Sequence, residues 1–201
     1  MKIDSVGASM RFWPQRRWKK ILLLFFLALL VVVAVLASFV GLVVMPNINK
    51  DVISDIEVIN SSGSKTALVV YQPGYTGFPK DISYAFADGL ASSGCRVEIT
   101  TASSQTPSNL SRYSLLVLGF PVYAGNTENA VVRYLNRTGN LNGINTVLLA
   151  ADGLNSPDLG IDNMKQEVQA ANGTVYDSLA LWNWNFSAKD LARQAGSKIA
   201  P

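Results

Sequence analysis

Residues 66–80 read TALVVYQPGYTGFPK and set the first expectation for the fold. The continuous apolar run 67–71 is typical of a strand buried on both faces, as strands of parallel sheets are. Two glycines then allow a tight turn, and Pro79 suits the first turn of a helix. The apolar spacing of the residues that follow (Ile82, Ala85, Phe86 and Leu90) marks one helical face. The stretch therefore predicts a strand, a turn and a helix over about 79–92.

The same alternation continues to the end of the chain. It predicts strands at 96–100, 115–118, 146–150 and 174–181, with helices after a cap at Thr127, at 161–171 and at 188–199. Segments 103–114, 119–126 and 152–158 are expected to be loops. Buried strands joined by helical crossovers favour a parallel sheet with helices on both faces. We therefore predict an α/β fold with a doubly wound, five-stranded parallel sheet.

A separate feature precedes this pattern, because residues 21–45 form a stretch of 25 residues without a charged side chain. A helix of that length can cross a hydrocarbon core of about 30 Å, which predicts one transmembrane helix. A cleaved signal peptide is the alternative interpretation. The apolar part of a signal peptide is usually only about 7–15 residues long, so an uncleaved anchor is favoured.

The charges on either side of this helix predict its orientation. Residues 1–45 contain six Lys or Arg and one acidic residue, and five N-x-Ser/Thr sequons all follow position 46. Cytoplasmic flanks are rich in Lys and Arg. We therefore expect a basic cytoplasmic tail at 1–20, the span at 21–45, a linker at 46–65 and an extracytoplasmic domain at 66–201. A β-prone stretch, 52–59, lies within that linker and predicts either a short strand or an extended tether.

Composition excludes several classes of function. Residues 46–201 carry 11 basic and 13 acidic side chains, a net charge of −2, which does not favour nucleic-acid binding. Histidine is absent and Cys95 is the single cysteine. Catalysis by a Ser-His-Asp or Cys-His arrangement, a metal site and an internal disulfide are therefore not expected, and no catalytic side chain is predicted.

Three segments follow predicted strands and so belong at the carboxyl edge of the sheet, where open α/β sheets bind ligands. The first, 72–80, combines two glycines with Thr76 and Lys80, which fits a backbone cradle for phosphate or an ordinary strand-to-helix turn. The second reads GFPVYAG at 119–125, and the third reads AADGL at 150–154. Trp182 and Trp184 follow the fifth strand at the same edge. Three roles stay open for them: a wall of the site, an interface, or packing against the domain.

Taken together, these segments resemble the flavodoxin family. The family's phosphate loop has a Thr-Gly-Asn-Thr core, and this chain has YTGFP at 75–79 in that place. The family also has a Gly-Ser-Pro-Val-Tyr-x-Gly segment, which residues 119–125 resemble. Residues 185–196 resemble the family's last helix. The resemblance covers about 66–199 and implies strand order 2-1-3-4-5 and FMN as cofactor.

The resemblance also implies which residues bind FMN. The phosphate would be bound by Gly74, Tyr75, Thr76, Gly77 and Phe78, with charge from Lys80. The flavin ring would be flanked by Pro121, Val122, Tyr123, Ala124, Gly125, Ala151, Asp152 and Gly153, with Tyr123 stacked on it. The chain departs from the family pattern at Phe78 and Pro79, which removes two polar contacts and one backbone N–H.

These expectations combine into a membrane-anchored flavodoxin-like protein that binds FMN and transfers electrons. Its expected partners are the lipid bilayer and a redox protein or quinone. Two alternatives remain open: a flavin-free binding or structural module with a degraded phosphate loop, and a flavin-dependent reductase.

Overall fold

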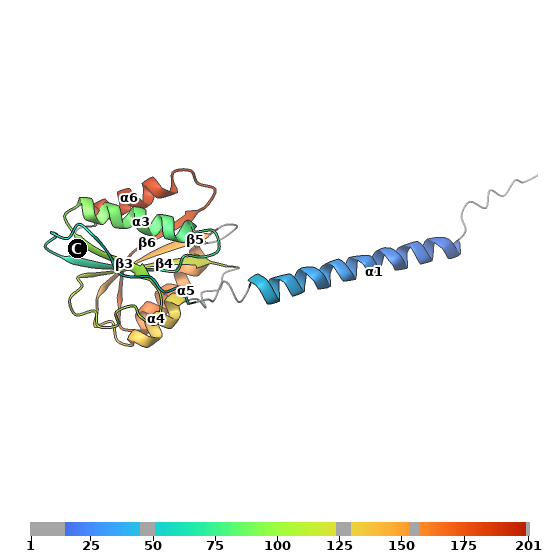
Figure 1. Ribbon diagram of the computed structural model, residues 1–201, viewed down its shortest axis with the longest axis horizontal. Helices are drawn as coiled ribbons and strands as arrows, with labels where there is room; N and C mark the ends of the chain where they lie inside the picture. The colour runs from blue at the N-terminus through green and yellow to red at the C-terminus, as the bar shows by residue number, and fades with distance from the viewer. Residues whose placement is uncertain (1–14, 45–50, 124–129, 153–156, 200–201) are drawn as a thin grey trace, which may run out of the picture. The chain divides into compact units, whose positions relative to one another are not determined.

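The computed structural model describes residues 15–44, 51–123, 130–152 and 157–199 (Figure 1). The chain divides into two compact units, Met1–Pro46 and Asn47–Pro201. Each unit is described by itself below.

The first unit contains helix α1, Gln15–Phe39, which continues as a π-helical turn, η1, Val40–Val44. The side chains of residues 17–42 are all exposed, and most of them are apolar. The segment Arg17–Leu42 is long and apolar enough to cross a membrane, by length and composition alone. Membrane insertion of this helix stays a prediction.

The second unit is built on a six-stranded sheet. Its strands are β1 (Glu57–Ile59), β2 (Thr66–Tyr71), β3 (Arg96–Thr101), β4 (Leu115–Val122), β5 (Asn145–Asp152) and β6 (Thr174–Trp182), in the order β1-β3-β2-β4-β5-β6. Strands β2 to β6 are all parallel, which confirms the predicted order of five strands. The predicted strand count was wrong by one.

The additional strand is β1, which pairs antiparallel with β3 inside the segment expected to be a linker. Its three residues are exposed or half-buried. So short a segment carries too little periodicity to be distinguished from an extended tether. In the folded domain, β1 occupies backbone groups of β3 that would otherwise form an open sheet edge.

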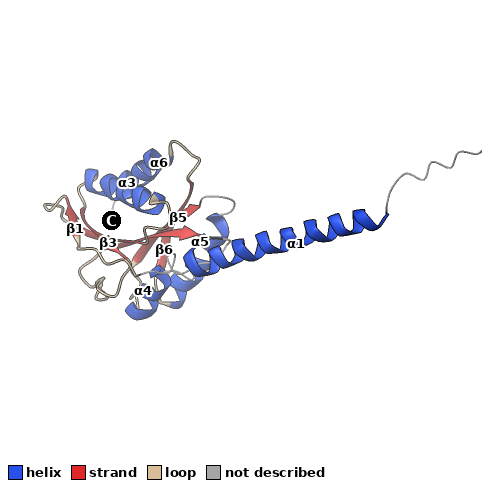
Figure 2. Cartoon of the chain, turned by 45° about the vertical axis from the view of Figure 1, so that its right-hand side comes forward, coloured by secondary structure: helices blue, strands red, loops and turns tan. Residues whose placement is uncertain are grey.

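Four helices cover the sheet in two layers: α3 (Phe78–Ser92) and α6 (Ala188–Lys198) on one face, α4 (Ala130–Thr138) and α5 (Pro157–Ala170) on the other (Figures 1 and 2). This arrangement confirms the doubly wound α/β fold. The connection from β3 to β4, residues 102–114, contains no helix. The predicted cap at Thr127 lies outside the described residues.

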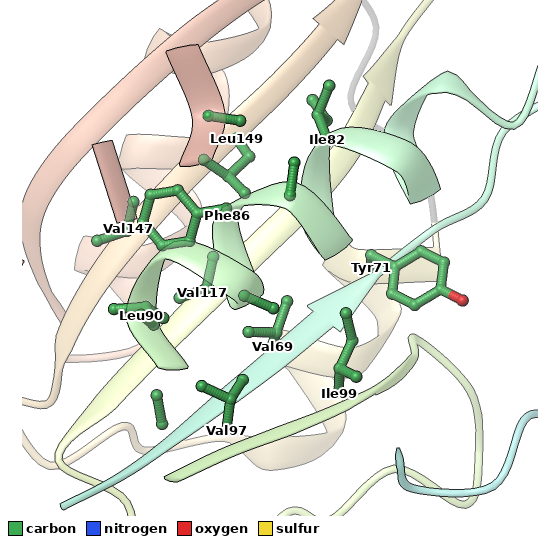
Figure 3. Close-up of a cluster of buried hydrophobic side chains, with 14 of the residues drawn as sticks. Val69, Tyr71, Ile82, Phe86, Leu90, Val97, Ile99, Val117, Val147 and Leu149 are labelled. Atoms are coloured by element: carbon green, nitrogen blue, oxygen red, sulfur yellow. The ribbon is translucent and has the colours of Figure 1, made fainter. Parts of the chain in front are cut away.

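The two layers bury two hydrophobic cores. Val69, Phe86 and Leu149 belong to the core under α3 and α6, shown in Figure 3. Leu68 and Phe120 belong to the core under α4 and α5. Because successive strand residues point to opposite faces, both faces of β2 are apolar, and this explains the continuous run 67–71.

Where the helix-free connection covers β3, a polar network lies beside the apolar packing of Ala102, Leu110 and Tyr113. The Glu98 side chain is only 4% exposed, and its carboxylate accepts hydrogen bonds from Arg112 Nη2 at 2.6 Å and the Tyr113 hydroxyl at 2.7 Å. Arg96 Nη2 adds a third contact at 3.2 Å. Burial and the hydrogen bond to Glu98 raise the pKa of Tyr113. Three donors thus compensate one buried carboxylate.

Helices α3 and α6 approach each other through glycines. A Cβ placed on Gly196 would lie 2.2 Å from the carbonyl oxygen of Phe86, and one on Gly89 would lie 2.1 Å from that of Arg193. Both neighbours are backbone atoms, which cannot turn away as a flexible side chain can. The two helices can therefore pack this closely only without side chains at positions 89 and 196.

We expect Gly196→Ala to destabilise the domain by about 1–3 kcal/mol, since overpacking forces the two helices apart. In an unpacked helix the same change stabilises by up to ~1 kcal/mol, so the expected sign is reversed. The measurement is the urea midpoint of the full chain in detergent, followed by circular dichroism. Ser197→Ala, at the exposed neighbouring position, is the matched control and should change the midpoint little. Equal midpoints for Gly196→Ala and wild type would contradict the prediction.

Candidate functional site

The candidate site lies at the carboxyl edge of the sheet. Residues 72–77 connect β2 to α3, Tyr123 follows β4 directly, and residues 183–187 connect β6 to α6. Because β2, β4 and β6 run parallel, these segments emerge at the same edge. The fold therefore brings the predicted phosphate loop together with segments from the far end of the sequence.

Residues 74–77 form a turn that depends on two glycines. Gly74 has φ +68° and Gly77 has φ +73°, a left-handed conformation that other residues rarely adopt. Gly77 caps α3, and its carbonyl oxygen accepts a hydrogen bond from the Asp81 N–H at 3.0 Å. The sequence thus forms, at the start of a 15-residue helix, the turn that was expected from it.

This turn leaves backbone donors available. Within the described residues, the N–H groups of Thr76 and Gly77 make no hydrogen bond to another segment and only weak contacts inside the turn 74–76. The Thr76 hydroxyl accepts only a long hydrogen bond, 3.4 Å, from the Phe78 N–H. Together with the positive end of the α3 dipole, these donors make a site suited to an anion.

Tyr123 joins the first loop to β4. Its hydroxyl accepts a hydrogen bond from the Tyr75 N–H at 2.9 Å, and a Cβ on Gly74 would lie 3.1 Å from the same hydroxyl. Burial raises the pKa of Tyr123, although the Tyr75 N–H favours the phenolate and opposes this shift. The side chain therefore points at the phosphate loop, and its stacking on a flavin stays a prediction.

Two lysines lie beside the loop in different settings. Lys80 Nζ lies 5.5 Å from the ring centroid of Tyr84, whereas Lys189 Nζ forms an ion pair with Asp81 Oδ2 at 2.7 Å. Lys189 also lines a hollow of about 280 Å³ together with Thr76, Phe78, Asp81, Asn183, Asn185, Phe186 and Ala188. Sequence reasoning missed Lys189, because only the packing of α6 against α3 brings it to the loop. The available signal was its position in the first turn of the helix that follows the last strand.

The second and third predicted segments are partly strand. Pro121 and Val122 are the last residues of β4, Ala151 and Asp152 are the last of β5, and they pair across the two strands. The prediction that loops begin at 119 and 152 was wrong. Phe120 and Val122 are buried in the core under α4 and α5, and this burial extends the pairing past Pro121. Ala124, Gly125 and Gly153 lie outside the described residues.

The described residues offer no alternative metal chemistry. No group of three or more His, Cys, Asp or Glu side chains gathers anywhere in that part of the chain. Cys95 is buried, and burial raises the pKa of its thiol. The groups present at this edge are backbone N–H groups, the Thr76 hydroxyl and the ion pair of Lys189 with Asp81.

Comparisons with solved structures identify the architecture. The chain is similar to an archaeal flavodoxin (15% identity, TM-score 0.56, covering 67% of this chain and 96% of that one) and to Megasphaera elsdenii flavodoxin (19%, 0.55, 66% and 99%). The flavodiiron core of Flv1 from Synechocystis also matches (14%, 0.56, 69% and 36%). The domain has the flavodoxin fold. No protein-family model and no curated protein sequence matches the chain.

At these identities the flavodoxin-like architecture is established and the ligand is not. The residues of the site must therefore carry any conclusion about binding. The most informative of them is Tyr123, because its hydroxyl lies where the first loop presents its backbone.

We expect the Tyr123 phenol to titrate above its ordinary pKa of about 10, since burial disfavours the phenolate. The measurement is the phenolate absorbance of the full chain, minus that of Tyr123→Phe, as the pH is raised. In the pH range above the ordinary value, wild type should gain one more phenolate than the variant. A difference spectrum that is complete by pH ~10 would contradict the burial of this hydroxyl.

Proposed function

We propose that this chain is a membrane-anchored flavodoxin-like protein that binds FMN and transfers electrons. The observation that carries the proposal is the glycine turn at 74–77 at the start of α3, where the Thr76 and Gly77 N–H groups make no hydrogen bond to another segment of the described residues. FMN would supply the redox chemistry, and the protein would bind and orient it.

The residues present fit the phosphate end of FMN. The N–H groups of Thr76 and Gly77 would donate to phosphate oxygens, and the Thr76 hydroxyl can rotate to do the same. Lys189, on the neighbouring helix α6, lies beside the hollow that Thr76 lines and is paired there with the Asp81 carboxylate, so its ammonium would bind a phosphate by exchanging that partner. These contacts offset part of what Phe78 and Pro79 remove from the family pattern.

The membrane part of the proposal rests on α1. The segment Arg17–Leu42 has the length and composition of a span, and we propose that it anchors the chain. The excess of Lys and Arg before it favours a cytoplasmic N-terminus and an extracytoplasmic domain. A redox protein of the membrane or a quinone would then exchange electrons with the flavin.

One observation favours a second candidate, a flavodoxin-like module that has lost the flavin. The Tyr123 hydroxyl already occupies the Tyr75 N–H, a donor that would otherwise be available to a phosphate oxygen. A protein that retains the fold as a binding or structural module would keep this contact. The two candidates differ in whether added FMN displaces the tyrosine hydroxyl.

We expect the full chain in detergent to quench the fluorescence of added FMN, and Thr76→Ala to weaken binding about tenfold. That factor corresponds to a charge-assisted hydrogen bond of ~1.5 kcal/mol. Thr174→Ala, at the exposed start of β6, is the matched control and should bind as wild type does. Unquenched FMN with all three proteins would contradict the flavin proposal and support the flavin-free module.

Tyr123→Phe should tighten FMN binding about fivefold, since it frees the Tyr75 N–H for ~1 kcal/mol of hydrogen bonding. The aromatic ring is retained, so any stacking on the flavin is unchanged. The same fluorescence titration measures the effect. Weaker binding by Tyr123→Phe would mean that the hydroxyl contacts FMN and does not compete with it.

A further inference from the structure

The domain concentrates exposed apolar side chains at one edge. Eleven large apolar side chains are exposed in its described part. Seven of them lie at the carboxyl edge of the sheet: Val52, Ile53, Tyr75, Leu159, Trp182, Trp184 and Phe186. The remaining four are Ile56 just before β1, Val58 in β1, Tyr176 near the start of β6 and Leu191 in α6. Three of the seven, Trp182, Trp184 and Phe186, lie together at the end of β6, and a local group of exposed aromatic side chains indicates an interaction surface.

The most exposed members lie on a turn that holds them outward. Phe186 is 104% exposed and Trp184 is 73% exposed. The Asn185 N–H donates to the Trp182 carbonyl oxygen at 3.0 Å, and the Ala188 N–H donates to that of Asn185 at 3.0 Å. The Ser187 N–H also donates to Asn185 Oδ1 at 3.0 Å. The turn is thus fixed by its own hydrogen bonds, and its aromatic side chains contribute little to the core.

The chain enters the domain at this same edge. The Thr101 N–H, at the carboxyl end of β3, donates to Ser54 Oγ at 3.0 Å, and the Ser104 N–H donates to Asp51 Oδ2 at 3.3 Å. Residues 51–54 therefore lie beside the carboxyl end of β3. From there β1 runs antiparallel to β3, toward the amino edge.

Six residues, 45–50, separate η1 from this point of attachment. Fully extended, the connection from Val44 to Asp51 reaches at most about 25 Å, at ~3.5 Å per residue. If α1 spans the bilayer, Asp51, beside the carboxyl end of β3, is held within that reach of the point where the chain leaves the membrane. A tether this short gives the edge a high effective concentration at the lipid surface.

We infer that the carboxyl edge of the domain docks on the lipid bilayer, with Trp184 and Phe186 inserted at the headgroup level. Trp and other aromatic side chains prefer this interface, where an apolar ring meets water on one side. The occupant is lipid, because the covalent connection supplies a bilayer permanently within reach. The inference rests on the anchoring in the proposed function and is independent of FMN.

Docking in this manner places the candidate site at the membrane surface. Phe186 and Thr76 line the same hollow, so the phosphate loop would lie beside the inserted turn. A ligand held there would exchange electrons with partners in or on the membrane. Partners diffusing in the aqueous phase would reach this edge less easily.

The test places a fluorophore on the turn. Cys95 is buried, so an environment-sensitive dye on Phe186→Cys labels one exposed thiol of the full chain. The matched control is Tyr176→Cys, which replaces an aromatic residue that is 57% exposed at the start of β6. Both substitutions remove exposed side chains and leave the two cores intact. Both proteins are reconstituted in phosphatidylcholine vesicles and collected by flotation.

We expect the dye at position 186, and only there, to show a blue-shifted emission in vesicles. This emission should be several-fold brighter than in the reference sample, which is detergent-free buffer with excess unlabelled protein. Spin-labelled lipids should quench that emission and leave position 176 unchanged. Aqueous emission at both positions in floated vesicles would overturn the docking and leave the anchor standing. Equal lipid exposure at both positions would overturn it as well, since no preferred face would exist. Failure of the chain to float with vesicles would refute the anchor, and the docking with it.

Discussion

The burial of strand β2 on both faces is the constraint on which the remaining structure depends. Its backbone pairs with β3 on one side and β4 on the other, in parallel registers such as Val69 with Ile99 and with Val117. Its side chains alternate between two cores, so neither face can be left to water. Two helical layers are therefore obligatory. Parallel pairing also requires crossover connections, and these place the functional loops at one edge.

The end of β2 shows how this constraint produces a site. At Tyr71 the strand is still buried, and four residues later Tyr75 is exposed. The chain reverses within this distance through Gly74 and Gly77, whose left-handed conformations only glycine adopts readily. The reversal brings the N–H groups of Thr76 and Gly77 to the start of α3. The proposed anion binding by the loop thus depends first on the turn geometry, and the side chains would only modify it.

Much of this could be predicted from the sequence, because the strongest signals are local. The run at 67–71, the stripe from Ile82 to Leu90 and the glycines of the turn each report one element, and the sheet order follows once the family resemblance is noticed. Three features could not be predicted from local patterns. The pairing of Glu57–Ile59 with β3, the ion pair of Lys189 with Asp81, and the extension of β4 to Val122 all depend on contacts between segments far apart in the chain.

Tyr123 shows why sequence similarity and geometry must be weighed separately at this site. The family resemblance predicts that it belongs to a ring-binding segment, whereas its hydroxyl contacts the predicted phosphate loop at Tyr75. A tyrosine at the end of β4 can reach that loop because β2 and β4 are neighbours, and Gly74 leaves the space that a Cβ would narrow. The same neighbouring strands would bring a phosphate and a flavin ring together. The contact between Tyr123 and Tyr75 therefore fits two cases. In one, the hydroxyl occupies the Tyr75 N–H until a phosphate displaces it, and in the other the domain binds no flavin and keeps the contact.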